Sequence, residues 1–153
     1  DIGQGWQCFS VQGVTEANRP ERVAAAMPAF EKRIRFWQHE TGVGPLHTTL
    51  IGFSQGAIMA LESTQFSGAS RHAARVVAIA GRFAQPPRRM PEDIAVHLMH
   101  GEQDQVIPVR LAADAEHELR SLGANATLDR FAGLGLGIDA RVIEAIGRRL
   151  ETM

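Results

Sequence analysis

The feature that most constrains the fold is an apolar run that passes through a glycine-flanked serine into a helix. Residues 47–53 (HTTLIGF) are rich in β-branched and apolar side chains, which predicts a strand, and residues 57–66 have helical composition. Between them, Gly52-Phe53-Ser54-Gln55-Gly56 matches G-x-S-x-G. In a strand–turn–helix context this pattern is a nucleophile elbow, which exposes the serine hydroxyl at the end of the sheet. Ser54 is therefore the candidate nucleophile.

The neighbours of Ser54 have predicted roles of their own. Gly52 and Gly56 are expected to remove side chains that would collide with the adjoining strand and helix. The backbone amide of Gln55, at the helix N-terminus, is placed to stabilise a developing oxyanion. The alternative is an ordinary serine in a glycine turn, because matches to so short a pattern also arise by chance.

The rest of the chain alternates between helical and strand-like segments. A helix is predicted after Asn18-Arg19-Pro20, with Gly42 as its stop, and its spacing places Val23, Met27, Phe30, Ile34 and Trp37 on one buried stripe. Residues 8–14 form a short extended stretch, and the apolar runs 75–80 and 94–99 are typical of strands buried on both faces. Residues 126–131 are also predicted to form a strand. Two more helices are indicated by Leu111, Ala115, Leu119 and Leu122, which precede Gly123, and by Ile138, Val142, Ile146 and Leu150.

This alternation predicts an α/β protein with an open, mostly parallel sheet and helices on both faces. The 153 residues are enough for one domain with a real core and too few for two ordinary domains, so we expect residues 1–153 to form a single domain. Functional sites in such folds form at the carboxyl ends of the strands, which is where Ser54 falls.

A candidate acid follows a later strand. Asp104 lies in His100-Gly101-Glu102-Gln103-Asp104-Gln105-Val106-Ile107-Pro108, directly after the strand predicted to end at Met99. Its carboxylate is expected at the same sheet edge as Ser54, in the chain order serine, acid, histidine of this fold. Glu102 is the local rival, and a solvated loop aspartate is the alternative interpretation.

Composition excludes several classes of partner. The formal net charge is −1 without a basic stripe, so neither nucleic acid nor an anionic membrane surface is an expected partner, and a small neutral ligand is favoured. The single cysteine, Cys8, excludes an internal disulfide and fits a reducing compartment, for which the cytoplasm is the default. No run approaches the roughly 20 apolar residues of a membrane span. No pattern calls for a metal or an organic cofactor.

Two further patterns resemble ligand sites but do not have the spacing that such sites require. Gly133, Gly135 and Gly137 precede a helix, but the acidic residue of a nucleotide-binding fingerprint does not follow at the expected spacing. His97 and His100, three apart on a predicted strand, should point to opposite faces and so should not share a metal. Among the histidines, only His100 is a candidate for a substitute base, although its place before Gly101 favours support of the acid loop.

The elbow 50–57, the acid loop 100–108 and the opening Phe9-Ser10-Val11-Gln12-Gly13 together resemble the small bacterial esterases of the phospholipase/carboxylesterase family. The resemblance covers nearly the whole chain and implies an α/β-hydrolase fold and a small-molecule ester substrate. It implies that Ser54 is the nucleophile of a catalytic triad and that Asp104 orients a histidine.

The chain departs from the family pattern in two ways. The family histidine follows a glycine after the last strand, and here Leu136 stands in its place in Ala132-Gly133-Leu134-Gly135-Leu136-Gly137-Ile138-Asp139. A leucine cannot accept the serine proton, so activity should be weak or absent, and a non-catalytic binding protein is the alternative. Family strands that precede 9–13, one of which leads into a second oxyanion loop, are not found. We therefore expect an N-terminally incomplete α/β-hydrolase whose uncovered sheet edge favours self-association.

Overall fold

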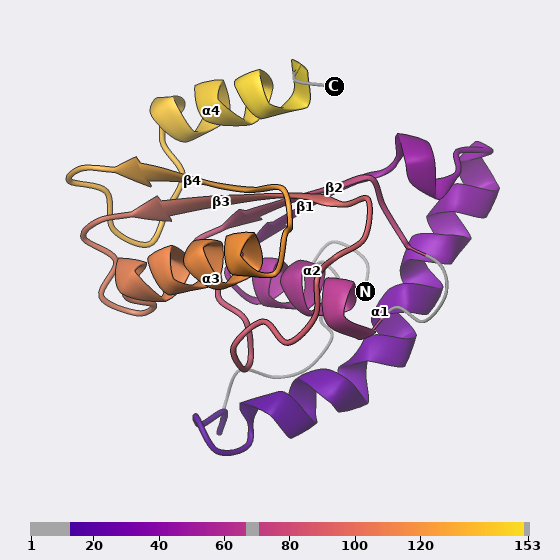
Figure 1. Ribbon diagram of the computed structural model, residues 1–153, viewed down its shortest axis with the longest axis horizontal. Coiled ribbons are helices and arrows are strands. Elements are labelled where there is room, and N and C mark those ends of the chain that lie inside the picture. The colour runs from indigo at the N-terminus through magenta and orange to yellow at the C-terminus, as the bar shows by residue number, and fades with distance from the viewer. Residues whose placement is uncertain (1–12, 67–70, 152–153) are drawn as a thin grey trace.

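The computed structural model describes residues 13–66 and 71–151, in which helices alternate with strands as the sequence predicts (Figure 1). The elements are α1 (Arg19–Thr41), the 3-10 turn η1 (Pro45–His47), β1 (Thr49–Phe53), α2 (Gln55–Phe66), β2 (Arg75–Ile79), β3 (Ala95–Gly101), α3 (Val109–Ser121), β4 (Ala126–Phe131) and α4 (Ala140–Glu151). The predicted extended stretch 8–14 lies almost wholly outside the described residues.

The four strands form one parallel sheet in the order β1-β2-β3-β4. The register pairs Phe53 with Ile79, Ile79 with Met99, and Gly101 with Phe131, so the carboxyl ends of all the strands lie along one edge. The α/β class and the parallel sheet are thereby confirmed. This edge is where the loops after each strand can meet.

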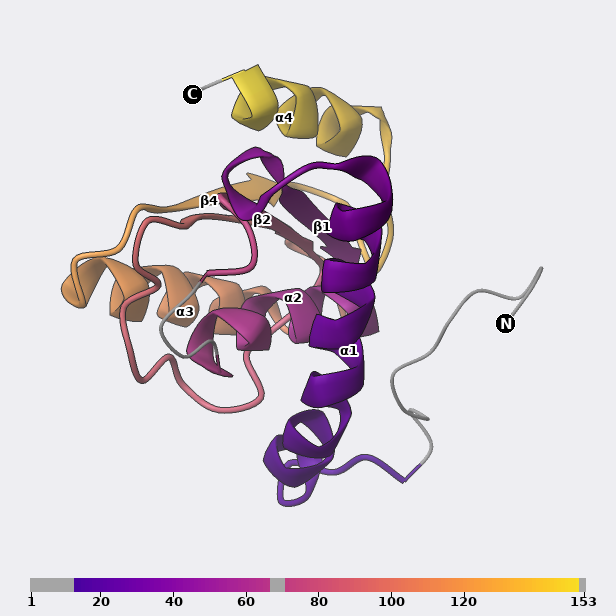
Figure 2. The ribbon, with the colours of Figure 1, turned by 90° about the vertical axis from the view of Figure 1, so that its right-hand side faces the viewer.

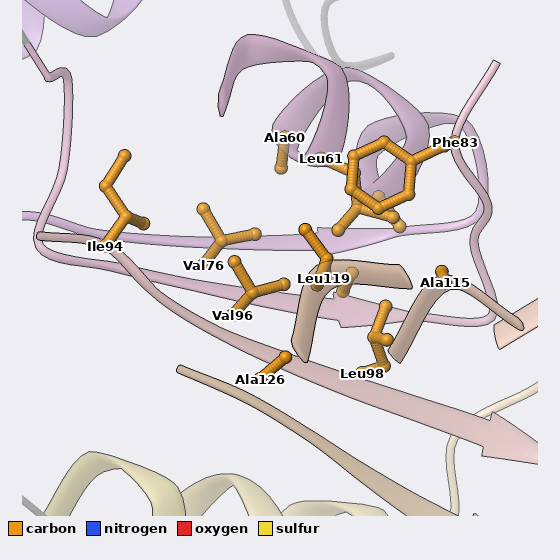
Figure 3. Packing of buried hydrophobic residues seen from close by; sticks show 12 residues of the cluster. Ala60, Leu61, Val76, Phe83, Ile94, Val96, Leu98, Ala115, Leu119 and Ala126 are labelled. Atoms are coloured by element: carbon orange, nitrogen blue, oxygen red, sulfur yellow. The ribbon is translucent and has the colours of Figure 1, made fainter. Parts of the chain in front are cut away.

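Helices cover both faces of the sheet, as predicted. Figure 1 shows α4 on one side of the sheet and α2 and α3 on the other. Strand β2 explains why, because Val76 and Ala78 belong to a buried cluster with α2 and α3, whereas Val77 and Ile79 pack with α4. Figure 3 shows the first of these clusters, in which side chains of the strands meet Leu61 of α2 and Leu119 of α3.

Helix α1 runs alongside the sheet and packs against α2 (Figure 2). It ends at Gly42, which has the left-handed φ of 67° expected of a C-cap glycine. Met27 of the predicted stripe is buried against Ile58 and Met59 of α2.

The prediction that Trp37 lies on the buried stripe of α1 is wrong. Trp37 is 58% exposed, whereas Val23, Met27 and Ile34 are buried and Phe30 is partly buried. The reason is that Trp37 lines an open groove with Val43 and Leu50 instead of a packed interface with α2. Helical spacing specifies a face of the helix, but burial also requires a second element to cover that face.

His97 on β3 has an environment that opposes its protonation. Its side chain is buried on the α4 face of the sheet, with Nδ1 2.7 Å from the Thr127 hydroxyl. Burial, and then the positive charges of Arg149 and Arg75, lower the pKa of His97 from 6.5 to about 4. The unfolded chain therefore binds a proton at His97 between about pH 6.5 and 4, where the folded chain does not.

We expect the free energy of unfolding to fall by about 2 kcal/mol from His97 alone when the pH is lowered from 7 to 5. Urea denaturation at both pH values measures this loss. His97→Gln should remove that part of the loss, and His39→Gln, at a fully solvated position of α1, should leave it unchanged. An equal pH dependence in the wild-type chain and the His97 variant would contradict the assignment.

Candidate active site

Ser54 occupies a sharp turn between β1 and α2. Its φ of 52° lies in the left-handed region, which a non-glycine residue seldom adopts. The turn is held because the Ser54 amide donates to Ile79 of β2 at 2.9 Å and the Ser54 carbonyl accepts from the amide of Ile58 at 3.0 Å. Within the described part of the chain, the Ser54 hydroxyl has no hydrogen-bond partner. The serine is thus half-buried at the sheet edge with its hydroxyl available.

The two flanking glycines have different structural roles. A Cβ added to Gly52 would lie 2.4 Å from both the carbonyl carbon and the oxygen of Gly56, so only glycine permits this approach of β1 to α2. A Cβ on Gly56 would meet no described atom within 4 Å. The expectation that both glycines avoid a collision is therefore right for Gly52 and wrong for Gly56, because Gly56 contributes its backbone to the contact.

Asp104 is buried in the loop after β3. Its Oδ1 accepts hydrogen bonds from the amides of Val106 and Ile107, both at 2.9 Å, and its side chain is fully buried. Glu102, the rival candidate, is exposed and lies 3.3 Å from the Arg130 guanidinium on the surface. Burial and fixed orientation therefore distinguish Asp104 from Glu102.

The second carboxylate oxygen of Asp104 is left without a partner. Oδ2 is buried and has no hydrogen bond to any described residue. The Nε2 atom of His100 is 3.3 Å away, but Nε2 is 2.7 Å from the Ile107 carbonyl, which can only accept a hydrogen bond and therefore receives its proton. A buried carboxylate oxygen without a donor is costly, so this oxygen is expected to bind a group that the described residues lack.

His100 supports the acid loop. It is 2% exposed and its Nε2 is engaged with the Ile107 carbonyl at the far end of that loop. His97 lies on the opposite face of β3 with the α4 cluster, as its spacing from His100 predicts. In the described ranges, no three histidine, cysteine, aspartate or glutamate side chains gather as metal ligands would.

The loop that contains Leu136 lies against the acid loop. The Gln103 amide donates to the Leu134 carbonyl at 2.8 Å, and a Cβ on Gly101 would come within 2.6 Å of the Gly135 oxygen. Leu136 itself is 43% exposed. The fold therefore brings position 136 and Asp104 into adjacent loops at the sheet edge that also holds Ser54.

Ser54 lines a cleft of about 610 Å³. Part of its wall is apolar, from Ile58 of α2 and from the acid loop and the start of α3. The wall also carries four charged residues, Glu16, Arg19, Arg82 and Arg110. This volume suits a small organic molecule.

Sequence reasoning missed the charged wall. Oε1 of Glu16 accepts from Nη1 of Arg19 at 2.8 Å and from Nη1 of Arg82 at 2.7 Å, and Oε2 accepts from Nη2 of Arg82 at 3.2 Å. The hydrogen bond from Arg19, and then that from Arg82, hold the pKa of Glu16 below its ordinary value. These residues come from the segment before α1, its first residue and the loop after β2, so no local pattern could connect them.

The parallel sheet, the strained serine between β1 and α2 and the buried aspartate after β3 define the class of α/β-hydrolases. A family model described as phospholipase/carboxylesterase matches residues 2–153, and the chain belongs to this family. No helix in the described segments has the length and apolar character to cross a membrane.

Known proteins of this class resemble the chain in sequence and structure. It is 46% identical over 140 residues to "Esterase YpfH" of Escherichia coli strain K12, which covers 92% of the chain and 60% of that relative. The chain therefore spans about three fifths of the curated relative. The crystal structure of esterase PE8 matches with a TM-score of 0.82 and 26% identity, over 95% of this chain and 69% of PE8. The fold is also shared with the Bacillus cereus carboxylesterase, at a TM-score of 0.72 and 14% identity, over 85% of this chain and 61% of that one.

Proposed function

We propose that the chain derives from a serine carboxylic-ester hydrolase whose proton-transfer residue has been replaced by Leu136. With histidine at position 136, the Ser54 hydroxyl would attack the acyl carbonyl while its proton passes to the imidazole, and the Gln55 amide would stabilise the oxyanion. The imidazole would then protonate the departing alcohol. Water would release the acyl group from Ser54 by the same steps, with Asp104 orienting the imidazole throughout.

The observation that carries this proposal is the unpartnered Oδ2 of Asp104. A fully buried carboxylate with one oxygen held by two amides and the other unsatisfied matches the acid that orients a histidine. The loop with position 136 is hydrogen-bonded to the same acid loop through Gln103 and Leu134. An imidazole N–H at position 136 is the donor that Asp104 lacks.

The alternative is a protein that binds a small ester without hydrolysing it. Leu136 favours this alternative, because a serine without an adjacent base is a weak nucleophile near neutral pH. The two functions differ in what they release. An activated short-chain ester should give at least a burst of chromophore from a functional nucleophile, whereas a binding protein retains the ester intact in a stoichiometric complex.

Covalent labelling tests the proposal directly. The chain and its Leu136→His variant are treated with a neutral alkyl fluorophosphonate, and the intact mass and the modified peptide are measured. We expect the variant to gain a single adduct on Ser54 far faster than the chain itself, and a Leu136→His/Ser54→Ala variant to gain none. Absence of an adduct in the folded Leu136→His variant would count against the serine-hydrolase function.

We further propose that the 153-residue chain self-associates through β1. In the described residues β1 pairs only with β2, so its other edge carries unpaired backbone groups. Ile51 and Phe53 of this strand are 51% and 42% exposed. Such an apolar edge strand is a template for pairing with another chain.

We expect multi-angle light scattering to report species larger than a monomer at micromolar concentration. Ile51→Lys should shift the distribution toward the monomer, because a charge at this position opposes edge pairing. Ile143→Lys, on the exposed face of α4 where Ile143 is 59% exposed, serves as the matched control and should have little effect. A monomeric wild-type chain at these concentrations would rule out the association.

We infer that residues 1–153 form one α/β-hydrolase domain, since β1, β2 and β3 share one continuous buried cluster with α2 and α3. A cytoplasmic location is supported by the single cysteine alone.

A further inference from the structure

The charged wall of the Ser54 cleft has an excess of positive charge. Its titratable members among the described residues are Glu16, Arg19, Arg82 and Arg110, which together carry a formal charge of +2. Arg110 has no ion-pair or hydrogen-bond partner within the described ranges. A cleft with this excess of positive charge attracts anions.

Arg82 is fixed in the geometry that binds a carboxylate. Its Nε donates to the Phe83 carbonyl at 3.0 Å, which orients the guanidinium, and its two terminal nitrogens contact both oxygens of Glu16. This two-point arrangement is the preferred mode of carboxylate recognition by arginine. The arginine side chain is 15% exposed, so the donor group is largely enclosed by the protein.

The carboxylate that occupies this position is itself poorly enclosed. The Glu16 side chain is 73% exposed, whereas its two partners, Arg19 and Arg82, are 16% and 15% exposed. Glu16 lies on the solvent side of two largely enclosed guanidinium groups, so water reaches its carboxylate and a second carboxylate can take over its hydrogen bonds to them. Glu16 thus occupies, as an internal carboxylate, a site that a carboxylate from solution can also fill.

We propose that the Ser54 cleft contains a carboxylate subsite formed by Arg82, Arg19 and Arg110, and that Glu16 occupies it until a ligand displaces it. The proposal rests on the proposed function, and it narrows the substrate class to esters that carry a free carboxylate, such as half-esters of short dicarboxylic acids. In the bound ester, the ester carbonyl lies next to Ser54, and the free carboxylate binds Arg82 on the charged wall of the same cleft.

The test measures binding of glutarate to the 153-residue chain by NMR titration, with the neutral diamide glutaramide as the comparison ligand. We expect glutarate to bind at least tenfold more tightly than glutaramide. Arg82→Gln should weaken glutarate binding by on the order of tenfold, because a charged two-point contact is lost. Arg148→Gln, at an exposed position of α4, is the matched control and should leave binding unchanged.

Glu16→Gln distinguishes a ligand subsite from a purely structural ion pair. If Glu16 competes with the ligand, its neutral variant should bind glutarate several-fold more tightly. If the ion pair only anchors the segment before α1, the same variant should bind glutarate more weakly or no differently, and the proposal is overturned. Glu21→Gln, in the first turn of α1, controls for the loss of one negative charge.

A replacement variant and a hydrolysis assay complete the test. Should Arg82→Gln fail to fold by circular dichroism, Arg110→Gln replaces it, and unchanged glutarate binding in that exposed-arginine variant overturns the proposal. The rate at which the Leu136→His variant hydrolyses a 4-nitrophenyl half-ester of glutarate is compared with its rate on 4-carboxyphenyl butyrate. The faster ester shows whether the acyl or the alcohol part of the substrate carries the carboxylate. Because glutarate binding requires no reaction at Ser54 and the fluorophosphonate is neutral, failure of the subsite and failure of the serine-hydrolase function are separately visible.

Discussion

Replacing Leu136 with histidine is expected to raise kcat/KM for a short-chain 4-nitrophenyl ester by on the order of 10³-fold or more. The physical reason is that Asp104 and Ser54 lie at one sheet edge, and the proposed triad lacks the histidine that would move the proton. The Asp104 carboxylate is preorganised by two backbone amides, so a new imidazole would gain an oriented acceptor without rearrangement of the acid loop. Initial rates of nitrophenolate release measure the effect.

Three variants make the result specific. Leu136→His/Ser54→Ala should return the rate to that of the chain, and Leu136→His/Asp104→Asn should lose most of the gain, because the asparagine amide would favour the wrong imidazole tautomer. Leu134→His places the same side chain two residues earlier in the same loop and should give no gain. Equal rates for the two histidine variants would mean that added histidine, and not position 136, is responsible, and the assignment of this position would be abandoned.

Gly52→Ala is expected to lower the free energy of unfolding by about 3 to 4 kcal/mol. The new methyl group would lie 2.4 Å from backbone atoms of Gly56 and 2.6 Å from the Ala57 amide nitrogen. Backbone atoms cannot move aside as the end of a flexible side chain can, so β1 and α2 must separate and the Ser54 turn between them must distort. Urea denaturation followed by circular dichroism measures the loss.

Gly56→Ala is the matched control for this effect. It adds the same methyl group two residues beyond Ser54, at a helical position where nothing described lies within 4 Å. Alanine favours the helix over glycine by about 0.5 to 1 kcal/mol, so the variant should be unchanged or slightly more stable. If the two variants were equally destabilised, the contact between Gly52 and Gly56 would not be the cause.

The sequence by itself determined the elements and their class. The apolar run 75–80 was sufficient for its strand, because a strand buried on both faces has to be almost continuously apolar. Gly42 fixed the end of α1 through its left-handed conformation, which is a local property of the chain. The candidate residues Ser54 and Asp104 were also accessible from sequence, since in a parallel sheet each strand delivers the residue after it to the same edge.

Only the tertiary structure decided which of these residues are buried, paired or free. It separated Asp104 from Glu102 and showed that Trp37 is exposed, because burial depends on whether another element covers a given face. It assembled Glu16, Arg19 and Arg82 around one cleft from segments up to 66 residues apart. Periodicity and motifs are carried by neighbours along the chain, whereas charge pairing and enclosure depend on distances in space that only packing sets.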